Sequence, residues 1–308
     1  MGHLLAAILP VFLLIFVGAA LRRTGFLGTA FWDAAERLTY FVLLPCLLVA
    51  TLAGTPLAGL RVWALVVAVV AALLVMTAAL ALLRPRLGFD GGAYSSLVQS
   101  ALRSNTYVGL AAAAGLYGEA GLAAAAVAVG AIVPLVNLLS VATLARHGDG
   151  ETTGAPPKPA ALLGQILRNP LILACALGIL LNATGLGLPA LIGPMLEILG
   201  RGALPLGLLA VGAALDFGGL GGQRRALALA AVLKLLVLPA FTALVCWALG
   251  LTGTAAAIAI LFNGLPTASS SYILARRMGG DAALMAGMIT IQTGASVVTL
   301  PLVLLAFA

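Results

Sequence analysis

The stretch Gln99-Ser100-Ala101-Leu102-Arg103-Ser104-Asn105-Thr106-Tyr107-Val108-Gly109 places six polar side chains and a glycine in the middle of an apolar segment. Backbone inside hydrocarbon must have its hydrogen bonds met within the protein. The segment must therefore line other protein or a cavity. A second stretch, Asn263-Gly264-Leu265-Pro266-Thr267-Ala268-Ser269-Ser270-Ser271, interrupts another apolar segment in the same way.

The two stretches occupy equivalent places in a sequence repeat. At an offset of 160 residues, Asn105 falls on Leu265 and Thr106 falls on Pro266. The other matched pairs are Pro10 with Pro170, Leu13 with Leu173, Gly18 with Gly178, Leu21 with Leu181, Gly25 with Gly185, Pro45 with Pro205, Leu48 with Leu208 and Ala50 with Ala210. Interrupted helices at corresponding positions of two repeats are the best sequence pointer to a transporter's binding site.

The composition excludes a water-soluble protein. Hydrophobic residues make up 63% of the 308 residues and charged residues 8%, and the mean hydropathy is +1.18. Crossing the hydrocarbon takes about 20 apolar residues per helix. The sequence therefore predicts an all-α membrane protein with ten transmembrane helices, at residues 4–22, 36–54, 61–83, 93–116, 120–146, 166–183, 191–215, 226–249, 253–275 and 282–306.

These helices form two five-helix repeats, residues 1–147 and 166–308, joined by a polar, proline-rich cytoplasmic linker at 148–165. Because five is odd, the second repeat enters the membrane from the opposite side, and the repeats are inverted. Inverted repeats build alternating-access carriers around a site near the bilayer midplane. A channel with the same symmetry would need a continuous polar pore.

Basic residues are distributed unequally between the two sides of the predicted bundle. One side holds Arg22, Arg23, Arg37, Arg84, Arg86, Arg146, Lys158, Arg168, Arg224, Arg225, Arg276 and Arg277. The other side holds Arg61 and Arg201. By the positive-inside rule the first side is cytoplasmic, so we expect a multi-pass protein of the bacterial inner (cell) membrane with both termini extracytoplasmic. The net charge of +7 is then a topology signal, and no nucleic-acid partner is expected.

The interrupted segments predict an anion site. Pro266 has no amide hydrogen and a fixed φ, so it breaks one half-helix and suits the first turn of the next. If both segments break, the N-terminal ends of two half-helices meet near the midplane, where free amides and aligned dipoles attract an anion. The alternative is that Pro and Gly merely kink the two helices.

Several motifs, taken in order, carry a resemblance to a known family. They are Leu9-Pro10-Val11-Phe12, Gly18, Arg22-Arg23-Thr24-Gly25, Phe41-Val42-Leu43-Leu44-Pro45, Asn105-Thr106, Arg168-Asn169-Pro170 and Pro266-Thr267-Ala268. Over nearly the whole chain the sequence resembles the auxin efflux carrier family, which includes plant auxin exporters and bacterial proteins assigned to malonate or malate transport. The fold of that family is similar to that of bile acid sodium symporters.

The resemblance implies a scaffold of helices 1, 2, 6 and 7, and a mobile transport unit of helices 3–5 and 8–10 in which helices 4 and 9 cross. It implies that Asn105 contacts the substrate carboxylate and that Pro266 is the proline of the second crossover. It also suggests a homodimer through the scaffold helices. Beside Asn105, the substrate-binding candidates are Thr106, Arg103, Asn263 and Thr267.

Two departures from the family pattern bear on this site. No proline follows Gly109, so the first break is expected to depend on Gly109 and local polar groups, as the second depends on Gly264 and Pro266. Arg103 puts a full charge about 15 Å into the helix, which is costly and points to function. Arg103 is expected either to pair with a substrate carboxylate through two parallel hydrogen bonds, or to cap freed carbonyls or bond to Gln292.

Five further polar side chains lie inside spans. Lys234 either reaches back to the cytoplasmic headgroups or takes part in the site. The other four are Gln99, Asn137, Gln292 and Thr293. They are expected either to act as coupling or second-layer groups of the mobile unit or to form helix–helix contacts.

The absence of certain residue types limits how transport could be coupled to an ion and which enzymatic reactions are possible. All nine acidic residues are expected in loops or at helix ends, which leaves no proton relay and favours a uniporter. The histidines and cysteines form no metal or catalytic cluster, so no cofactor, metal or enzymatic activity is expected. The predicted function is alternating-access transport of small organic carboxylates; the rivals are a sodium- or proton-coupled symporter on the same fold, and a membrane sensor or partner subunit without transport.

Overall fold

The computed structural model describes residues 2–56, 61–148, 164, 167–218 and 223–307, which are helical and contain no β-strand. The α-helices are α1 (Gly2–Arg23), α2 (Thr29–Leu38), α3 (Leu44–Gly54), α4 (Val62–Leu87), α5 (Gly91–Leu102), α6 (Thr106–His147), α8 (Pro170–Ala183), α9 (Gly193–Ala213), α10 (Arg224–Val232), α11 (Leu238–Ala248), α12 (Gly253–Gly264), α13 (Ser270–Met278) and α14 (Ala282–Phe307). Two π-helical turns, η1 (Thr39–Leu43) and η3 (Leu233–Val237), join α2 to α3 and α10 to α11. The predicted linker lies outside the described residues except at Gly148 and Gly164.

Among the described residues, seven helical stretches are long and apolar enough to cross a membrane. They are Leu4–Arg23, Thr29–Gly54, Val62–Leu87, Gly91–His147, Gly193–Ala213, Arg224–Ala248 and Ala282–Phe307. Two shorter apolar helices, Pro170–Ala183 and Gly253–Gly264, accompany them. The second stretch begins at Thr29, whereas the sequence predicted its start at residue 36.

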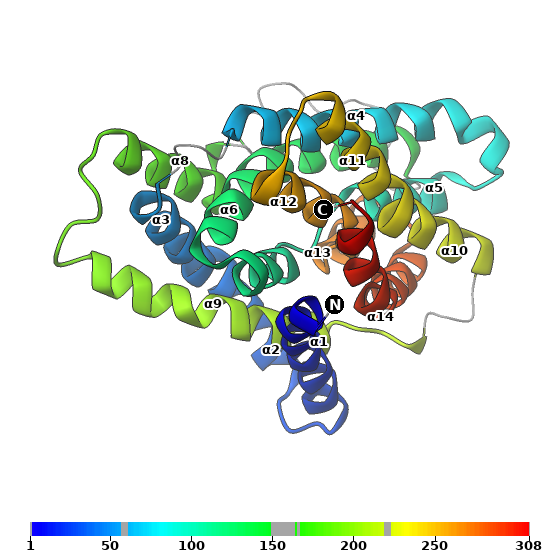
Figure 1. The fold of residues 1–308 in the computed structure, drawn as a ribbon. Coiled ribbons are helices and arrows are strands. Elements are labelled where there is room, and N and C mark those ends of the chain that lie inside the picture. The colour runs from blue at the N-terminus through cyan, green and yellow to red at the C-terminus, as the bar shows by residue number, and fades with distance from the viewer. Residues whose placement is uncertain (1, 57–60, 149–163, 165–166, 219–222, 308) are drawn as a thin grey trace.

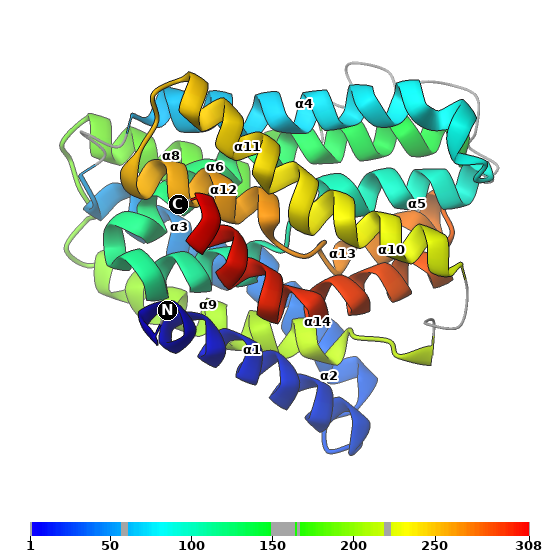
Figure 2. The same ribbon diagram turned by 45° about the vertical axis from the view of Figure 1, so that its right-hand side comes forward.

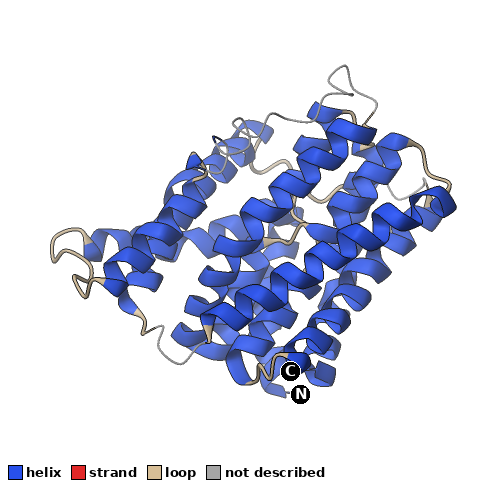
Figure 3. Ribbon diagram, turned by 90° about the horizontal axis from the view of Figure 1, so that it is seen from above, coloured by secondary structure: helices blue, strands red, loops and turns tan. Residues whose placement is uncertain are grey.

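The helices pack as two groups that face each other. In the first group α1 packs on α9, and α3 packs on both α8 and α9. In the second group α12 packs on α6, α11 and α4, while α14 packs on α10, α12 and α5. Figures 1 and 2 show α4, α11 and α10 on the far side of the molecule from α1 and α9. The two chain ends lie near each other in every view, most clearly from above (Figure 3).

Glycines allow the closest helix contacts in the first group. A Cβ on Gly18 would overlap the backbone of Leu209, so α1 and α9 touch backbone to backbone there. A Cβ on Gly178, the repeat equivalent of Gly18, would lie 2.8 Å from the Leu52 Cβ, where α8 meets α3. Small residues at such contacts are what brings membrane helices close together.

The long helix α6 is two helices joined at Gly118, whose φ of 59° and ψ of −145° lie outside the helical region. A Cβ on Gly121 would lie 2.5 Å from the carbonyl oxygen of Ala113. Eight residues of continuous helix would separate these positions by about 12 Å, so the chain folds back at this point. The second half of α6 thereby returns alongside the first and brings Asn137 toward the break between α5 and α6.

Candidate functional site

The first interruption lies between α5 and α6. Asp90 caps the start of α5, its carboxylate accepting a hydrogen bond from Ala93 N at 2.7 Å. The helix ends at Leu102 because Arg103 adopts an extended conformation, with φ −73° and ψ 141°. Asn105 then caps α6, because its Oδ1 accepts a hydrogen bond from Val108 N at 3.3 Å. The break therefore covers three residues, Arg103 to Asn105.

The second interruption lies between α12, which ends at Gly264, and α13, which begins at Ser270. The two breaks hydrogen-bond to each other. Asn105 N donates to the carbonyl oxygen of Pro266 at 2.9 Å, and the Ser104 hydroxyl donates to the carbonyl oxygen of Phe262 at 2.8 Å. Each break thus satisfies backbone groups that the other leaves free, as irregular backbone within a membrane requires.

The position predicted for the first break is wrong. Gly109 lies in the first turns of α6, and the chain leaves the helix six residues earlier, at Arg103. The role of Gly109 is close packing instead: a Cβ there would lie 2.6 Å from Leu265 Cδ1 and 2.8 Å from Phe262 Cζ. Pro266 lies within the second break but not in the first turn of the next half-helix, since α13 starts four residues later.

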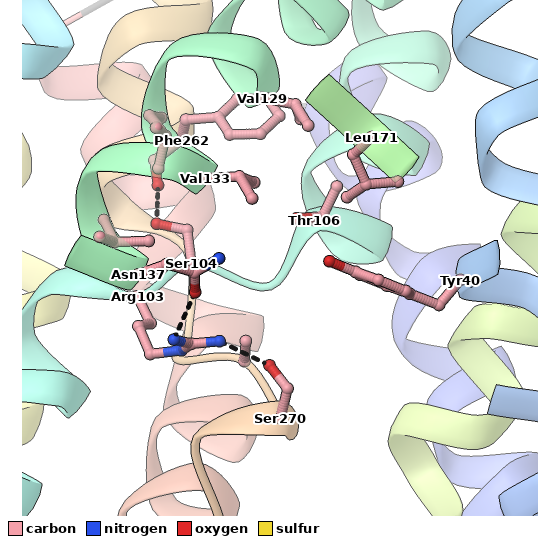
Figure 4. Close-up of a pocket in the computed structure, with 13 residues that line it drawn as sticks. Tyr40, Arg103, Ser104, Thr106, Val129, Val133, Asn137, Leu171, Phe262 and Ser270 are labelled. Carbon is pink, nitrogen blue, oxygen red and sulfur yellow. Dashed lines mark hydrogen bonds between the residues drawn. The ribbon is translucent and has the colours of Figure 1, made fainter. Parts of the chain in front are cut away.

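Arg103 connects the first break to two other elements (Figure 4). Its Nη1 donates to Asn137 Oδ1 on α6 at 2.8 Å, and its Nη2 donates to Ser270 Oγ at the start of α13 at 2.9 Å. The buried Nε has no hydrogen-bond partner among the described residues. Bonding to Gln292, one expected alternative, is not what the structure shows, because Gln292 bonds elsewhere.

A cavity of about 120 Å³ lies beside these groups. Arg103, Asn137 and Ser270 form one wall, and Thr106 and Tyr40 lie across from it (Figure 4). Ser104 also lines the cavity, and the rest of the wall is apolar and consists of Val129, Ile132, Val133, Val136, Leu171, Phe262 and Ala268. One end of the cavity is therefore cationic and the other suits a hydrocarbon group.

An adjoining cavity of about 60 Å³ is lined by Asn105, Thr106, Tyr40 and Glu36. The Asn105 side chain is 1% exposed and its Nδ2 has no acceptor within the described chain. A buried amide donor without a partner is costly, so this group is available to a ligand. Asn105 and Thr106 are both predicted substrate contacts, and the structure places both at these cavities.

The 60 Å³ cavity lies next to a larger cavity on one side of the protein. The 60 Å³ cavity shares Glu36 and Ser269 with a larger one of about 530 Å³, which is also lined by Arg22 and Arg276. A fourth cavity, of about 480 Å³, lies at Glu119, Glu197 and Arg201. Its described lining residues include none from the two small cavities. The site thus adjoins the larger cavity at Arg22 and Arg276 and not the one at Arg201.

Comparison with known proteins gives the broad class. Residues 159–304 match the family described as "Membrane transport protein", the family of auxin efflux carriers. The match covers just under half of the chain. A protein of Methanothermobacter thermautotrophicus named "uncharacterized transporter" is 26% identical over 299 residues, which cover 96% of this chain and 95% of that protein. The chain is therefore a multi-pass membrane transport protein, and the resemblance read from its motifs is confirmed.

Other predicted residues of this membrane transport protein lie behind the cavity walls rather than in them. Asn263 is fully buried and its Nδ2 donates to Thr242 Oγ1 at 2.8 Å. Thr267 is also fully buried, and its backbone N donates to Gln292 Oε1 at 2.9 Å. Gln292 in turn donates to Ser100 Oγ at 2.7 Å, and so joins α14 to α5. The buried Gln99 amide and Thr293 hydroxyl have no partner among the described residues.

Lys234 of the transporter does not reach the headgroups, which was one of its two predicted roles. Its side chain is 0% exposed, and its Nζ donates to Ser104 Oγ at 2.8 Å. It lies in the π-helical turn η3, ahead of Pro239. Lys234 thus contacts the first break through Ser104.

Three residues of the transporter's cavities, Glu36, Tyr40 and Ser270, are not predicted from the sequence. The placement of Glu36 at a helix end is wrong, because the helical stretch begins at Thr29 and runs through it. The first turns of α2 contain polar residues, so the pattern of apolar residues does not predict that the helical stretch already begins at Thr29. For Tyr40 the family motif Arg168-Asn169-Pro170 could have pointed to the site, because the Tyr40 hydroxyl accepts a hydrogen bond from Asn169 Nδ2 at 3.3 Å.

Proposed function

We propose that this transporter carries small organic carboxylate anions across the bacterial inner membrane by alternating access. The observation that supports this most directly is the pair of hydrogen-bonded helix breaks beside a cavity with a guanidinium at one end. Guanidinium binds carboxylate through two parallel hydrogen bonds, and Asn105 offers an unpartnered amide donor close by.

The proposed architecture is ten spans in two inverted repeats. Counting the two halves of α6, the short helix α8 and the broken pair α12–α13 as spans raises the seven long stretches to ten. Gly18 on α1 and Gly178 on α8 are repeat equivalents, and each makes a close contact with a helix of the other repeat. The adjacent chain ends support the expectation that both termini lie on the same side of the membrane (Figure 3).

The proposed moving part is the group of α4–α6 and α10–α14, which holds both breaks. The scaffold is α1–α3 with α8 and α9, through which a homodimer would form. Sliding the first group along the second would carry the cavity past the membrane midplane, as in an elevator. The larger cavity next to the site is lined by Arg22 and Arg276, so under the positive-inside rule this state would face the cytoplasm.

The proposed substrates are short aliphatic monocarboxylates. An apolar cavity of about 150 Å³ holds benzene, so the larger of the two small cavities, at about 120 Å³, accommodates a similar number of heavy atoms. Its far wall is aliphatic and aromatic, and Arg103 is the one cation in its lining among the described residues. A second carboxylate would therefore be buried without a partner, which is expensive. Indole-3-acetate has roughly twice as many heavy atoms as benzene and would not fit this state.

The test is thermal stabilisation of the purified protein by a panel of acids. The panel contains acetate, isovalerate, malonate, malate and indole-3-acetate, each with its neutral amide and each in sodium or choline buffer. We expect isovalerate to raise the melting temperature in both buffers, and its amide to have no effect. Asn105→Ala should abolish the shift while leaving the unliganded protein folded.

A matched control is Asn182→Ala, which removes an amide that caps Leu52 and Thr55 carbonyls in the scaffold. It should lower stability without changing the shift caused by the acid. Equal stabilisation by acids and amides would overturn the anion site, and a shift that appears only in sodium would point to the symporter instead. Stabilisation without flux in liposomes would favour a sensor.

A further inference from the structure

We propose that Lys234 is a built-in counter-charge for the transported anion, acting through Ser104 from behind the cavity wall. This inference rests on the proposed function, since it assigns a role at the same site. Lys234 would be a specificity-determining residue that selects anionic over neutral ligands without touching them.

The placement of the ammonium group is the first support. Lys234 is the eleventh residue of the helical stretch that starts at Arg224, so it lies about 15 Å along that helix. Its side chain is fully buried. The one hydrogen-bond acceptor found for Nζ in the described chain is Ser104 Oγ, at 2.8 Å, and no described carboxylate accepts from it.

Ser104 connects this charge to the cavity. It is the middle residue of the first break, lies next to Arg103, and lines the 120 Å³ cavity. Its hydroxyl proton goes to the carbonyl oxygen of Phe262, and its lone pair accepts from Lys234. The ammonium is thus separated from the cavity lining by a single hydroxyl. Opposite charges about 6 Å apart in a protein interior change affinity about 100-fold, and we take this as the scale of the expected effect.

The cost of burial indicates what the charge is for. An ammonium in a dry interior with one neutral acceptor destabilises the protein, and an apolar side chain of the same length would pack as well. The arrangement becomes favourable when an anion enters the cavity. The same reasoning predicts that a neutral variant is at least as stable as the wild type when empty, but binds acids poorly.

The experiment measures two quantities, the melting temperature of the unliganded protein and the dissociation constant for isovalerate. For Lys234→Met we expect an unchanged or higher melting temperature and a dissociation constant about 10- to 100-fold larger. Lys234→Arg should retain most of the affinity. Arg225→Ala, an exposed change on the same helical stretch, is the control and should alter neither quantity.

Chemical rescue separates charge from packing. In Lys234→Ala, propylammonium replaces the missing atoms and charge, whereas propanol replaces the atoms alone. We expect propylammonium to restore isovalerate binding and propanol to leave it weak. Equal rescue by the two compounds, or undiminished binding by Lys234→Met, would overturn the counter-charge while leaving the proposed function intact. A wild type that binds no acid would overturn both.

Discussion

Gly109→Ala is a sensitive test of how the two breaks fit together. A Cβ at this position would lie 2.6 Å from Leu265 Cδ1 and 2.8 Å from Phe262 Cζ, whereas carbon atoms prefer about 3.5–4.0 Å. Both neighbours must therefore move by about 1 Å. Overpacking of this kind costs about 1–3 kcal/mol, and because Phe262 also lines the cavity, its displacement should weaken acid binding as well.

The matched control is Gly294→Ala in α14, where a new Cβ meets nothing within 4 Å. There the better helix propensity of alanine should stabilise the protein by up to about 1 kcal/mol. Thermal unfolding in detergent should rank Gly294→Ala at or above the wild type, and Gly109→Ala below it. Shortening the neighbour in Gly109→Ala/Leu265→Val should recover part of the loss. If Gly109→Ala proved as stable as Gly294→Ala, the close approach of α12 to α6 would be wrong.

Three more outcomes can be checked with purified or reconstituted protein. Arg103→Gln should raise the dissociation constant for acids about 10- to 100-fold, because charge-assisted hydrogen bonds contribute about 1.5–3 kcal/mol. Arg103→Lys should lose less affinity. Calorimetric titration measures both dissociation constants, with the exposed Arg84→Gln as the control. Glu36→Gln removes a negative charge from the cavity and should strengthen acid binding severalfold at low salt, an effect that should fade as ionic strength rises. Asp33→Asn, which lies in the larger cavity alone, should change acid binding less. Equal effects of the two variants would contradict a specific role for Glu36. Epitope tags at the two ends of the chain should both be accessible on intact spheroplasts, and access to only one would refute two repeats that each have an odd number of spans.

The parts of the site that depend on residue type are predictable from the sequence. Hydroxyl and amide side chains around Arg103, and a proline at 266, cannot continue an ordinary lipid-facing helix, so the amino-acid pattern alone reveals both interruptions. The identity of Asn105 as a cavity residue follows from the family resemblance. The partners of Arg103 do not follow, because Asn137 arrives only through the reversal at Gly118, and Ser270 only through the start of α13.

The wrong position for the first break and the headgroup alternative for Lys234 each have a physical cause. Gly109 suggests the break because glycine and a helix interruption are commonly associated, but the extended backbone of Arg103 to Asn105 ends the helix first, and the glycine serves the contact with Phe262. Lys234 suggests a headgroup contact because long basic side chains usually reach water. The direction of the Lys234 side chain depends on the π-helical turn before Pro239 and on the position of Ser104. Neither of these can be predicted from the spacing of apolar residues.

The hydrogen bonds exchanged between the breaks bear on how such a chain could have arisen. Asn105 N needs the carbonyl of Pro266, and Ser104 needs the carbonyl of Phe262, so neither half can close its own interruption inside a bilayer. In the inverted-repeat architecture proposed above, a single ancestral unit would have met the same requirement only by pairing with an identical unit inserted in the opposite orientation. Gene duplication would then have joined two partners that already depended on each other. Separately expressed halves of the present chain should accordingly survive in the membrane only when they are made together.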